Sequence, residues 1–532
     1  MKRVLMLGTA IAAVAATPAY AGDHRKSIDP YIEVGQVVTA DLTNDDVLTY
    51  STVAAGVDAS IQSNRAEAQI SARYERRISY QKQVGDSDVI SGLARGSVKI
   101  AQGLSLDAGV LATRARSDIR GAAPVNLAGN VDNISQVYSA YVGPTVSTHA
   151  GPVQIGGAYR FGYTKVESPG ATGIAPGETP LDVFDHATSH VAMASASVKP
   201  GAVLPVGVAV SGAYERDNAS QLDQRYEGKY VRGDVTLPVS ATLAVRAGAG
   251  YEKITVSERD ALVDAAGDPV VDRNGRYVTD PASPRRIAYE TDGLIYDAGV
   301  IWRPSPRTEL QANVGWRYGG MSYTGSLTWA ASRSVAVQVG VYDDVTTFGR
   351  QLRDGIAKLP TSFIDQRDAF SQQFSGCTFG NGQAGAGGCL NGVFQSISTS
   401  AYRARGVDAV LSANRGPLSF GVGAGYANRH FETPAGGPLD VDGLEDNSYY
   451  AQAFVNAALD SRSSISGDVI ANYYKSGLAG SRGIFSTGAT ASYFRTFGRL
   501  GATASAGIYS FSQQGTRDQV SAQGQVGMRY QF

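Results

Sequence analysis

Side chains alternate in character along the final segment of the chain. From Val520 to Phe532, the even positions carry apolar or small residues and the odd positions carry mostly polar ones. Successive side chains point to opposite faces only in an extended strand, so this period of two residues predicts a β-strand with one apolar face. That face meets a protein core in a soluble sandwich and lipid in a membrane barrel. The pattern therefore fixes the strand but leaves the surroundings of its apolar face open.

The same alternation recurs along the chain. It is clear in Ala66–Tyr74, Leu310–Tyr318 and Val335–Val341. Counting such segments gives about 22 strands, with a margin of roughly two to four, because strand boundaries are soft. After residue 21, no apolar stretch reaches the roughly 18 residues of a membrane helix. The sequence predicts an all-β protein built from antiparallel strands.

The connections between the expected strands alternate in length. Links such as Gln102-Gly103 and Phe497-Gly498 are tight. Every second link is often long, and the long ones are 117–130, 167–185, 258–286, 346–396 and 432–445. Short turns at one end and long loops at the other are typical of outer-membrane barrels, and a soluble sandwich gives no reason for this asymmetry. We therefore expect a single large transmembrane β-barrel.

The first residues have the features of an export signal. Lys2 and Arg3 precede an apolar run from Val4 to Ala16, and Ala19-Tyr20-Ala21 forms a cleavage site. The apolar run is too short to span a bilayer. We expect residues 1–21 to be a signal peptide and residues 22–532 to form the barrel. Removing two positive charges changes the formal net charge from −1 to −3, which argues against a nucleic-acid partner.

Aromatic residues support an outer-membrane location, with lipid and lipopolysaccharide as the surroundings. Tyr530 and Phe532 resemble the strand ending that the barrel-assembly machinery reads in many bacterial outer-membrane proteins. Odd-numbered strands tend to finish at a tyrosine, where amphipathic rings would form a girdle at the outer leaflet. The tyrosines expected there are Tyr74, Tyr163, Tyr214, Tyr251, Tyr318, Tyr342, Tyr426, Tyr474 and Tyr509.

The longest insertion, 346–396, contains both cysteines. Cys377 and Cys389 enclose a glycine-rich stretch, and an oxidising periplasm would join them in a disulfide worth about 2–3 kcal/mol. A metal site would need further ligands nearby, and the sequence shows none. Because a barrel of about 22 strands would have a very wide lumen, we expect this insertion to fold inward and narrow it.

Charged residues fall on the polar face of several strands. Those expected in the lumen are Arg73, Arg246, Glu309, Arg317 and Arg529. They would form either a polar interior whose charges satisfy one another or a wet lumen whose charges bias what passes. The sequence does not separate these alternatives.

Other polar groups give weaker signals. His186 and His190 lie four residues apart, but this spacing has little meaning outside a helix. Asp272-Arg273-Asn274-Gly275 predicts a hairpin turn in a raised loop. An acidic cluster (Asp440, Asp442, Glu445, Asp446) is either a solvated loop or a site for divalent cations that bridge lipopolysaccharide. No serine lies in a Gly-x-Ser-x-Gly elbow with suitable partners, so no catalytic residue, metal or cofactor is predicted.

The expected start of the first strand near Tyr31 leaves no room for an N-terminal plug. Barrels of about 22 strands with plugs are TonB-dependent receptors, and the chain also lacks the box that precedes such plugs. The sequence therefore predicts a barrel without a plug domain.

Part of the chain resembles a known family. Gly293–Tyr296, Trp302–Thr308, Trp316–Gly320 and Tyr342–Thr347 are similar to outer-membrane proteins associated with exosortase and exopolysaccharide loci. The resemblance implies a role beside polysaccharide export or surface sorting, with polysaccharide as a partner and no catalytic residues. The leading hypothesis is a pore or conduit, and the alternative is a sealed barrel that presents its loops to a partner.

Overall fold

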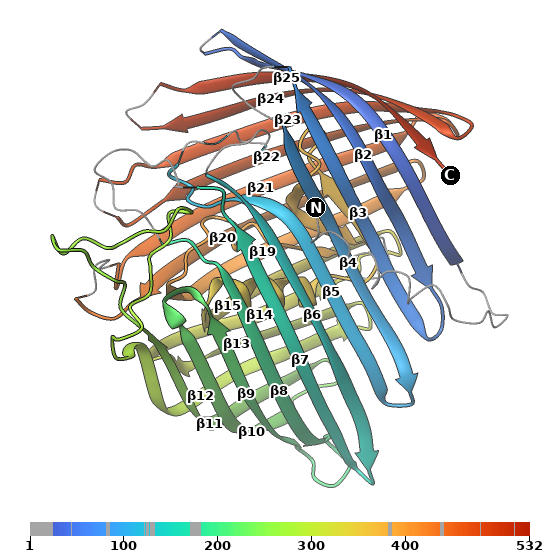
Figure 1. The fold of residues 1–532 in the computed structure, drawn as a ribbon. Helices are drawn as coiled ribbons and strands as arrows, with labels where there is room; N and C mark the ends of the chain where they lie inside the picture. The colour runs from blue at the N-terminus through green and yellow to red at the C-terminus, as the bar shows by residue number, and fades with distance from the viewer. Residues whose placement is uncertain are drawn as a thin grey trace.

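The computed structural model describes residues 25–43, 45–80, 86–121, 123, 127, 133–170, 182–380, 386–436, 441–478, 480–514 and 517–532. The predicted signal peptide lies outside these residues and stays a prediction. A sheet of 22 strands, antiparallel throughout, closes on itself, since β1 (Arg25–Asp41) pairs with both β2 (Asp46–Gln62) and β25 (Gln519–Gln531) (Figure 1). A closed sheet has no unpaired edge, and this satisfies the backbone hydrogen bonds within a membrane.

Each strand pairs with the next one along the wall of the barrel. The strands after β2 and before β25 are β3 (Ala66–Ser79), β4 (Ser87–Ala101), β5 (Leu104–Arg116), β6 (Ile134–Ala150), β7 (Val153–Glu167), β8 (His186–Val198), β9 (Gly207–Ala219), β10 (Arg225–Pro238), β11 (Leu243–Glu258), β12 (Arg286–Ser305), β13 (Thr308–Arg317), β14 (Gly320–Trp329), β15 (Val335–Thr346), β19 (Ala401–Arg415), β20 (Leu418–Glu432), β21 (Glu445–Ala458), β22 (Ser463–Lys475), β23 (Ile484–Phe497) and β24 (Leu500–Gln513).

The apolar side of each strand faces outward. On β25, Val526 and Met528 are 62% and 49% exposed, whereas Gln523 and Gln525 are buried. The same holds on the paired strand β1, where Val34 is exposed. A closed sheet with an apolar band around its outside requires lipid as its solvent. The protein is an outer-membrane β-barrel.

The lengths of the connections follow the predicted alternation. At one end, short turns such as 102–103, 151–152 and 498–499 join neighbouring strands. At the other end lie the long connections 117–133, 168–185, 259–285, 347–400 and 433–444. The long loops of outer-membrane barrels are extracellular, and this defines the extracellular end of the molecule.

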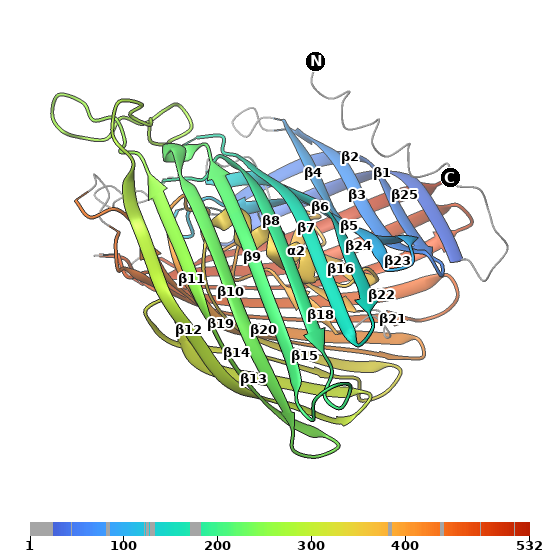
Figure 2. The ribbon, with the colours of Figure 1, turned by 90° about the horizontal axis from the view of Figure 1, so that it is seen from below.

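The connection between β15 and β19 folds into the lumen. This luminal insertion (residues 347–400) contains helix α2 (Phe348–Lys358) and a sheet of β16 (Phe363–Arg367), β17 (Phe374–Gly380) and β18 (Gly387–Cys389). Helix α2 contacts β5 to β8, and Figure 2 shows it within the ring of strands. Because β4 and β5 lie halfway around the ring from β15 and β19, the insertion crosses the barrel. Among the described residues, no helix is long and apolar enough to cross a membrane.

The predicted fold class is wrong in one part. The structure has the predicted all-β antiparallel barrel and the predicted number of strands. The prediction of a barrel without a plug is wrong, because a folded body occupies the lumen. No separate plug domain precedes β1 within the residues that the structure describes. An insertion between two paired strands can fill a lumen from the middle of the chain, so the early start of β1 did not decide the question.

The aromatic girdle is only partly as predicted. Tyr74, Tyr163, Tyr214 and Tyr251 are exposed on the outer face. Tyr318, Tyr474 and Tyr509 are instead buried inside, and Tyr342 packs beside a buried luminal cluster. On β22 and β24, the residues just before Tyr474 and Tyr509 are Tyr473 and Ile508, and these point outward. A shift of one residue along a strand moves a side chain to the other face of the sheet. Other outer-face rings at this end are Tyr296, Tyr449 and Tyr473.

Candidate functional site

Helix α2 anchors the luminal insertion to one half of the wall. Thr347 caps its first turn, accepting a hydrogen bond from the Arg350 amide at 3.4 Å. Phe348, Leu352 and Ile356 follow at intervals of four residues and share one face, which is completely buried. This face packs in a cluster with luminal side chains of β4 to β8. Full burial of an apolar side chain of this size contributes about 1.5–3 kcal/mol, so this contact is a strong one.

An arginine of the wall binds the end of α2. Arg95 on β4 donates from Nε to the Leu359 carbonyl and from Nη2 to the Ala357 carbonyl, both at 3.1 Å. Its guanidinium also lies 5.4 Å from the ring centre of Tyr141. The last carbonyls of a helix have no partner within the helix and carry partial negative charge, so a cation there satisfies and stabilises them.

A second wall arginine binds the far part of the insertion. Arg429 on β20 donates to the carbonyls of Gly392, Val393 and Ser396 at 2.7, 2.8 and 3.0 Å. Its side chain is completely buried and stacks on Tyr402. A buried guanidinium without a carboxylate is tolerated only where several acceptors surround it, and the carbonyls of the insertion supply them.

Charged side chains of the insertion also bond to groups of the wall. Arg350 forms ion pairs with Glu215 on β9 and Asp344 on β15, at 2.6 and 3.2 Å. Arg367 donates to the hydroxyls of Ser71 and Ser91, both at 2.9 Å. Contacts with β3, β4, β9, β15 and β20 hold the insertion around much of the circumference. The insertion is therefore a firmly attached body within the lumen.

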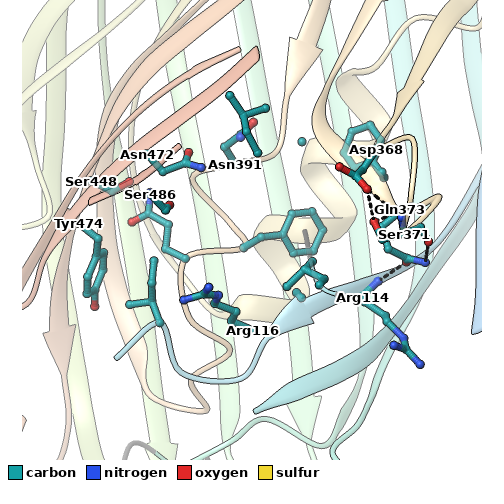
Figure 3. Close-up of a pocket in the computed structure, with 18 of the residues that line it drawn as sticks. Arg114, Arg116, Asp368, Ser371, Gln373, Asn391, Ser448, Asn472, Tyr474 and Ser486 are labelled. Atoms are coloured by element: carbon teal, nitrogen blue, oxygen red, sulfur yellow. Dashed lines mark hydrogen bonds between the residues drawn. The ribbon is translucent and has the colours of Figure 1, made fainter. Parts of the chain in front are cut away.

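A cavity of about 160 Å³ remains between the insertion and the wall (Figure 3). Its wall side comes from the extracellular end of β5 and from β21 to β23, and its inner side comes from the insertion. In Figure 3, Arg116, Asn472 and Ser486 point toward the cavity from the wall. Asp368 lies on the inner side, where it accepts hydrogen bonds from Ser371 and from the hydroxyl of Tyr509.

All five of the charges predicted for the lumen are paired with opposite charges. Arg73 bonds Glu33 and Glu75, Arg246 bonds Asp234, Arg317 bonds Glu252 and Arg529 bonds Asp58. Glu309 lies near the short-turn end and pairs with the exposed Arg303 at 2.8 Å. None of these five lines the cavity. Their contacts match the alternative in which luminal charges satisfy one another.

The two cysteines lie within the insertion and not on the molecular surface. A disulfide joins Cys377 on β17 to Cys389 on β18, and Cys377 is completely buried. The pair rests against Gly423 of β20, where an added Cβ would lie 2.7 Å from the Cys377 sulfur. The glycine therefore allows the insertion to approach the wall closely at this point.

The described members of the other polar clusters do not gather at one site. His186 contacts Asp185 and His190 contacts the hydroxyl of Tyr159, so the two histidines have different partners. Asp446 is buried and accepts from Tyr474 and Ser476, while Glu445 lies beside His430. Asp440 lies outside the described residues. Within the part of the chain that the structure describes, no three His, Cys, Asp or Glu side chains gather as a metal ion would need.

Sequence reasoning did not single out Arg95, Arg116, Arg429 or Asn472. Arg95 and Asn472 stand at inward-facing positions of their strands, and the alternation of side chains along the sequence indicates these positions. Their partners, however, lie in an insertion with no regular period. The sequence alone therefore does not indicate which luminal side chains bind the insertion, because this depends on how the insertion folds.

No protein family model and no curated protein matches the chain. Among solved structures, it is similar to the FrpB iron transporter from Neisseria meningitidis (F5-1 variant), with 10% identity and a TM-score of 0.43, over 95% of this chain and 82% of that one. It is also similar to the siderophore receptor PirA from Acinetobacter baumannii, with 7% identity and a TM-score of 0.41, over 95% and 80% of the two chains. The alcaligin outer-membrane receptor FauA from Bordetella pertussis shares 10% identity, with a TM-score of 0.39, over 94% and 76%. The predicted distinction between this barrel and such receptors is withdrawn.

Proposed function

We propose that the protein is an outer-membrane transport barrel whose lumen is gated by the luminal insertion. Small barrels fill their interior with side chains, but a barrel of 22 strands is far too wide for that. A folded insertion occupies the lumen of this one, and both of its ends continue into neighbouring wall strands. The observation that carries the proposal is this tethered closure, because a body held at both ends can shift aside without being lost.

The solute and partners are part of the proposal. The family resemblance supports a saccharide as the solute, with a place beside exopolysaccharide export or surface sorting. The luminal wall supports it too, since polar groups line the inner face and apolar groups the outer one. Folding into the membrane would use the barrel-assembly machinery, which we propose reads Tyr530 and Phe532. Their rings lie 5.3 Å apart at the end of β25.

Removal of the insertion tests the gate. Thr346 on β15 pairs with Tyr402 on β19, so an Asn-Gly turn can replace residues 348–400 and leave the wall intact. In liposome-swelling assays, we expect the full-length barrel to admit oligosaccharides slowly and the deletion variant to admit them fast. Retained strand content and heat-modifiable gel mobility would show that the variant is folded. Equal, slow rates for two folded barrels would contradict the proposal.

A docking role is the second candidate, and one loop favours it. The extracellular connection 259–285 is ordered by the bridges Ala261↔Thr279 and Val271↔Tyr277 and exposes Leu262, Val263 and Val271. Exposed apolar side chains on an ordered loop suit a protein partner. A strain without the gene that kept normal permeability but lost its surface polymer would favour docking over transport.

A further inference from the structure

The cavity beside the insertion has hydrogen-bonding groups that the protein does not use. Among the described residues, the side chains of Ser448, Asn472, Ser486 and Gln395 form no hydrogen bond. Ser448 and Gln395 are only 3% and 6% exposed. Their side-chain nitrogen and oxygen atoms are not among the buried unpartnered atoms of the structure, so they reach the space of the cavity and are free to bond its occupant. Several such groups around one cavity therefore suit a polar occupant.

These groups surround the cavity from several elements. Ser448, Asn472 and Ser486 come from three successive strands, β21 to β23, and Gln395 comes from the insertion opposite them. In Figure 3, Asn472, Ser448 and Ser486 lie close together on one side. Amides and hydroxyls both donate and accept hydrogen bonds, so the ring of groups suits a ligand that does the same at several points.

Charge and shape narrow the class of ligand. Arg114 and Arg116 contribute two positive charges, and Asp368 and Asp468 balance them with two carboxylates that accept hydrogen bonds from Tyr509 and Gln452. Phe374 and Phe394 add apolar faces to the lining. A strongly anionic ligand would meet these carboxylates, and an apolar one would leave the amides unsatisfied. The lining fits an uncharged ring with hydroxyls around its edge and apolar C–H groups on its faces.

The size allows no more than a single ring. A cavity of about 150 Å³ holds one benzene molecule, and this cavity has about 160 Å³. We propose that it is a binding site for one neutral sugar residue, held by the amides and hydroxyls of β21 to β23 and of the insertion. This inference deepens the proposed function by giving the chemical class of the solute. It rests on that function for the role of the site in transport.

Ligand-observed saturation-transfer NMR on the full-length barrel in detergent tests the site. The probes are methyl glucoside and methyl galactoside, with cyclohexanol as a ring that has only one hydroxyl. We expect saturable transfer to at least one glycoside and none to cyclohexanol. Asn472→Leu should weaken glycoside binding about tenfold, which corresponds to about 1.4 kcal/mol. Ser486→Ala, which removes only a hydroxyl, should weaken it less and guards against a folding defect in the first variant.

A matched control separates the cavity from the rest of the lumen. Asn313 on β13 is a luminal amide outside the cavity, so Asn313→Leu should leave binding unchanged. The inference is overturned by absence of glycoside binding, by equal binding of cyclohexanol, or by binding that none of the cavity variants alters. If glycosides bind as expected but removing the insertion opens no path, the transport proposal fails and the binding site stands.

Discussion

Arg429 of the barrel wall donates a hydrogen bond from Nη2 to the carbonyl oxygen of Val393 in the insertion, at 2.8 Å. The same guanidinium serves the carbonyls of Gly392 and Ser396, so one side chain satisfies three main-chain acceptors. Arg95 does the same at the end of α2, on the far side of the lumen. The wall thus holds the backbone of the insertion through its carbonyls, which do not depend on the side chains of the insertion itself.

Replacing Arg429 should loosen the far part of the insertion. In Arg429→Met, the three carbonyls lose their donor, and each buried acceptor left alone costs about 1–3 kcal/mol. We expect hydrogen exchange at the amides of Phe394 and Ile397 to become about ten- to a hundredfold faster. The Gln351 amide in α2 serves as an internal reference and should be unaffected.

The matched variant is Arg415→Met, at the exposed end of β19. It removes a guanidinium of equal size that makes no such contacts, and it should leave exchange in the insertion unchanged. Equally faster exchange in both variants would mean that the loss of a charge accelerates exchange. That result would contradict the claim that the hydrogen bonds of Arg429 hold the insertion.

Asp182 should make the extracellular loops sensitive to pH. It is buried beneath the loop 259–285 and accepts hydrogen bonds from Gln221 and from the Tyr277 amide. Burial raises the pKa of its carboxyl from 3.8 to about 7. A carboxyl whose pKa is raised on folding stabilises the fold below its usual pKa, and this contribution is lost as the pH rises through the raised value. The loop packing should therefore weaken between about pH 4 and pH 7 and change little above that.

Hydrogen exchange at the Tyr277 amide, corrected for its intrinsic pH dependence, measures this effect. Asp182→Asn keeps a side-chain carbonyl as acceptor but cannot ionise, so its corrected exchange should be flat across the same range. A wild-type profile as flat as that of the variant would refute the role of Asp182.

The outer face should tolerate charge according to depth. Val526 lies midway along β25 and is exposed to lipid, so Val526→Arg should destabilise the folded barrel in vesicles by about 2–4 kcal/mol. Val520 is on the same face near the extracellular end, and Val520→Arg should cost only about 0–1 kcal/mol. Urea unfolding of the two variants in lipid vesicles gives the comparison. Equal costs at both depths would argue against a membrane around this face.

The wall of the barrel and the inward course of the insertion could be predicted from the sequence, and the contacts of the insertion could not. Alternation at a period of two gives strand, face and pairing partner at once, because each strand pairs with its neighbour in the chain. In the insertion, contacts are made across the barrel. Phe363 binds Gln69 through two hydrogen bonds, with nearly 300 residues between them in the sequence. Nothing local to either residue indicates the other.

The same limit explains the misplaced tyrosines. Tyr474 and Tyr509 stand near the ends of strands as expected. Neighbouring residues of a strand point to opposite sides of the sheet, and here Tyr473 and Ile508 take the outer positions. The inward rings then bind luminal acceptors, Asp446 for Tyr474 and Asp368 for Tyr509. Burial of a tyrosine with a partner for its hydroxyl is as favourable as a place in the girdle, so residue type alone did not decide.

Single-channel recording in planar bilayers tests the central claim most directly. The full-length barrel should be closed or show only small, brief openings, because the insertion fills the lumen. The variant in which an Asn-Gly turn replaces residues 348–400 should show large, steady conductance, with the same strands around an empty lumen. A large steady conductance in the full-length protein, or none in a correctly folded deletion variant, would contradict a barrel that the insertion gates.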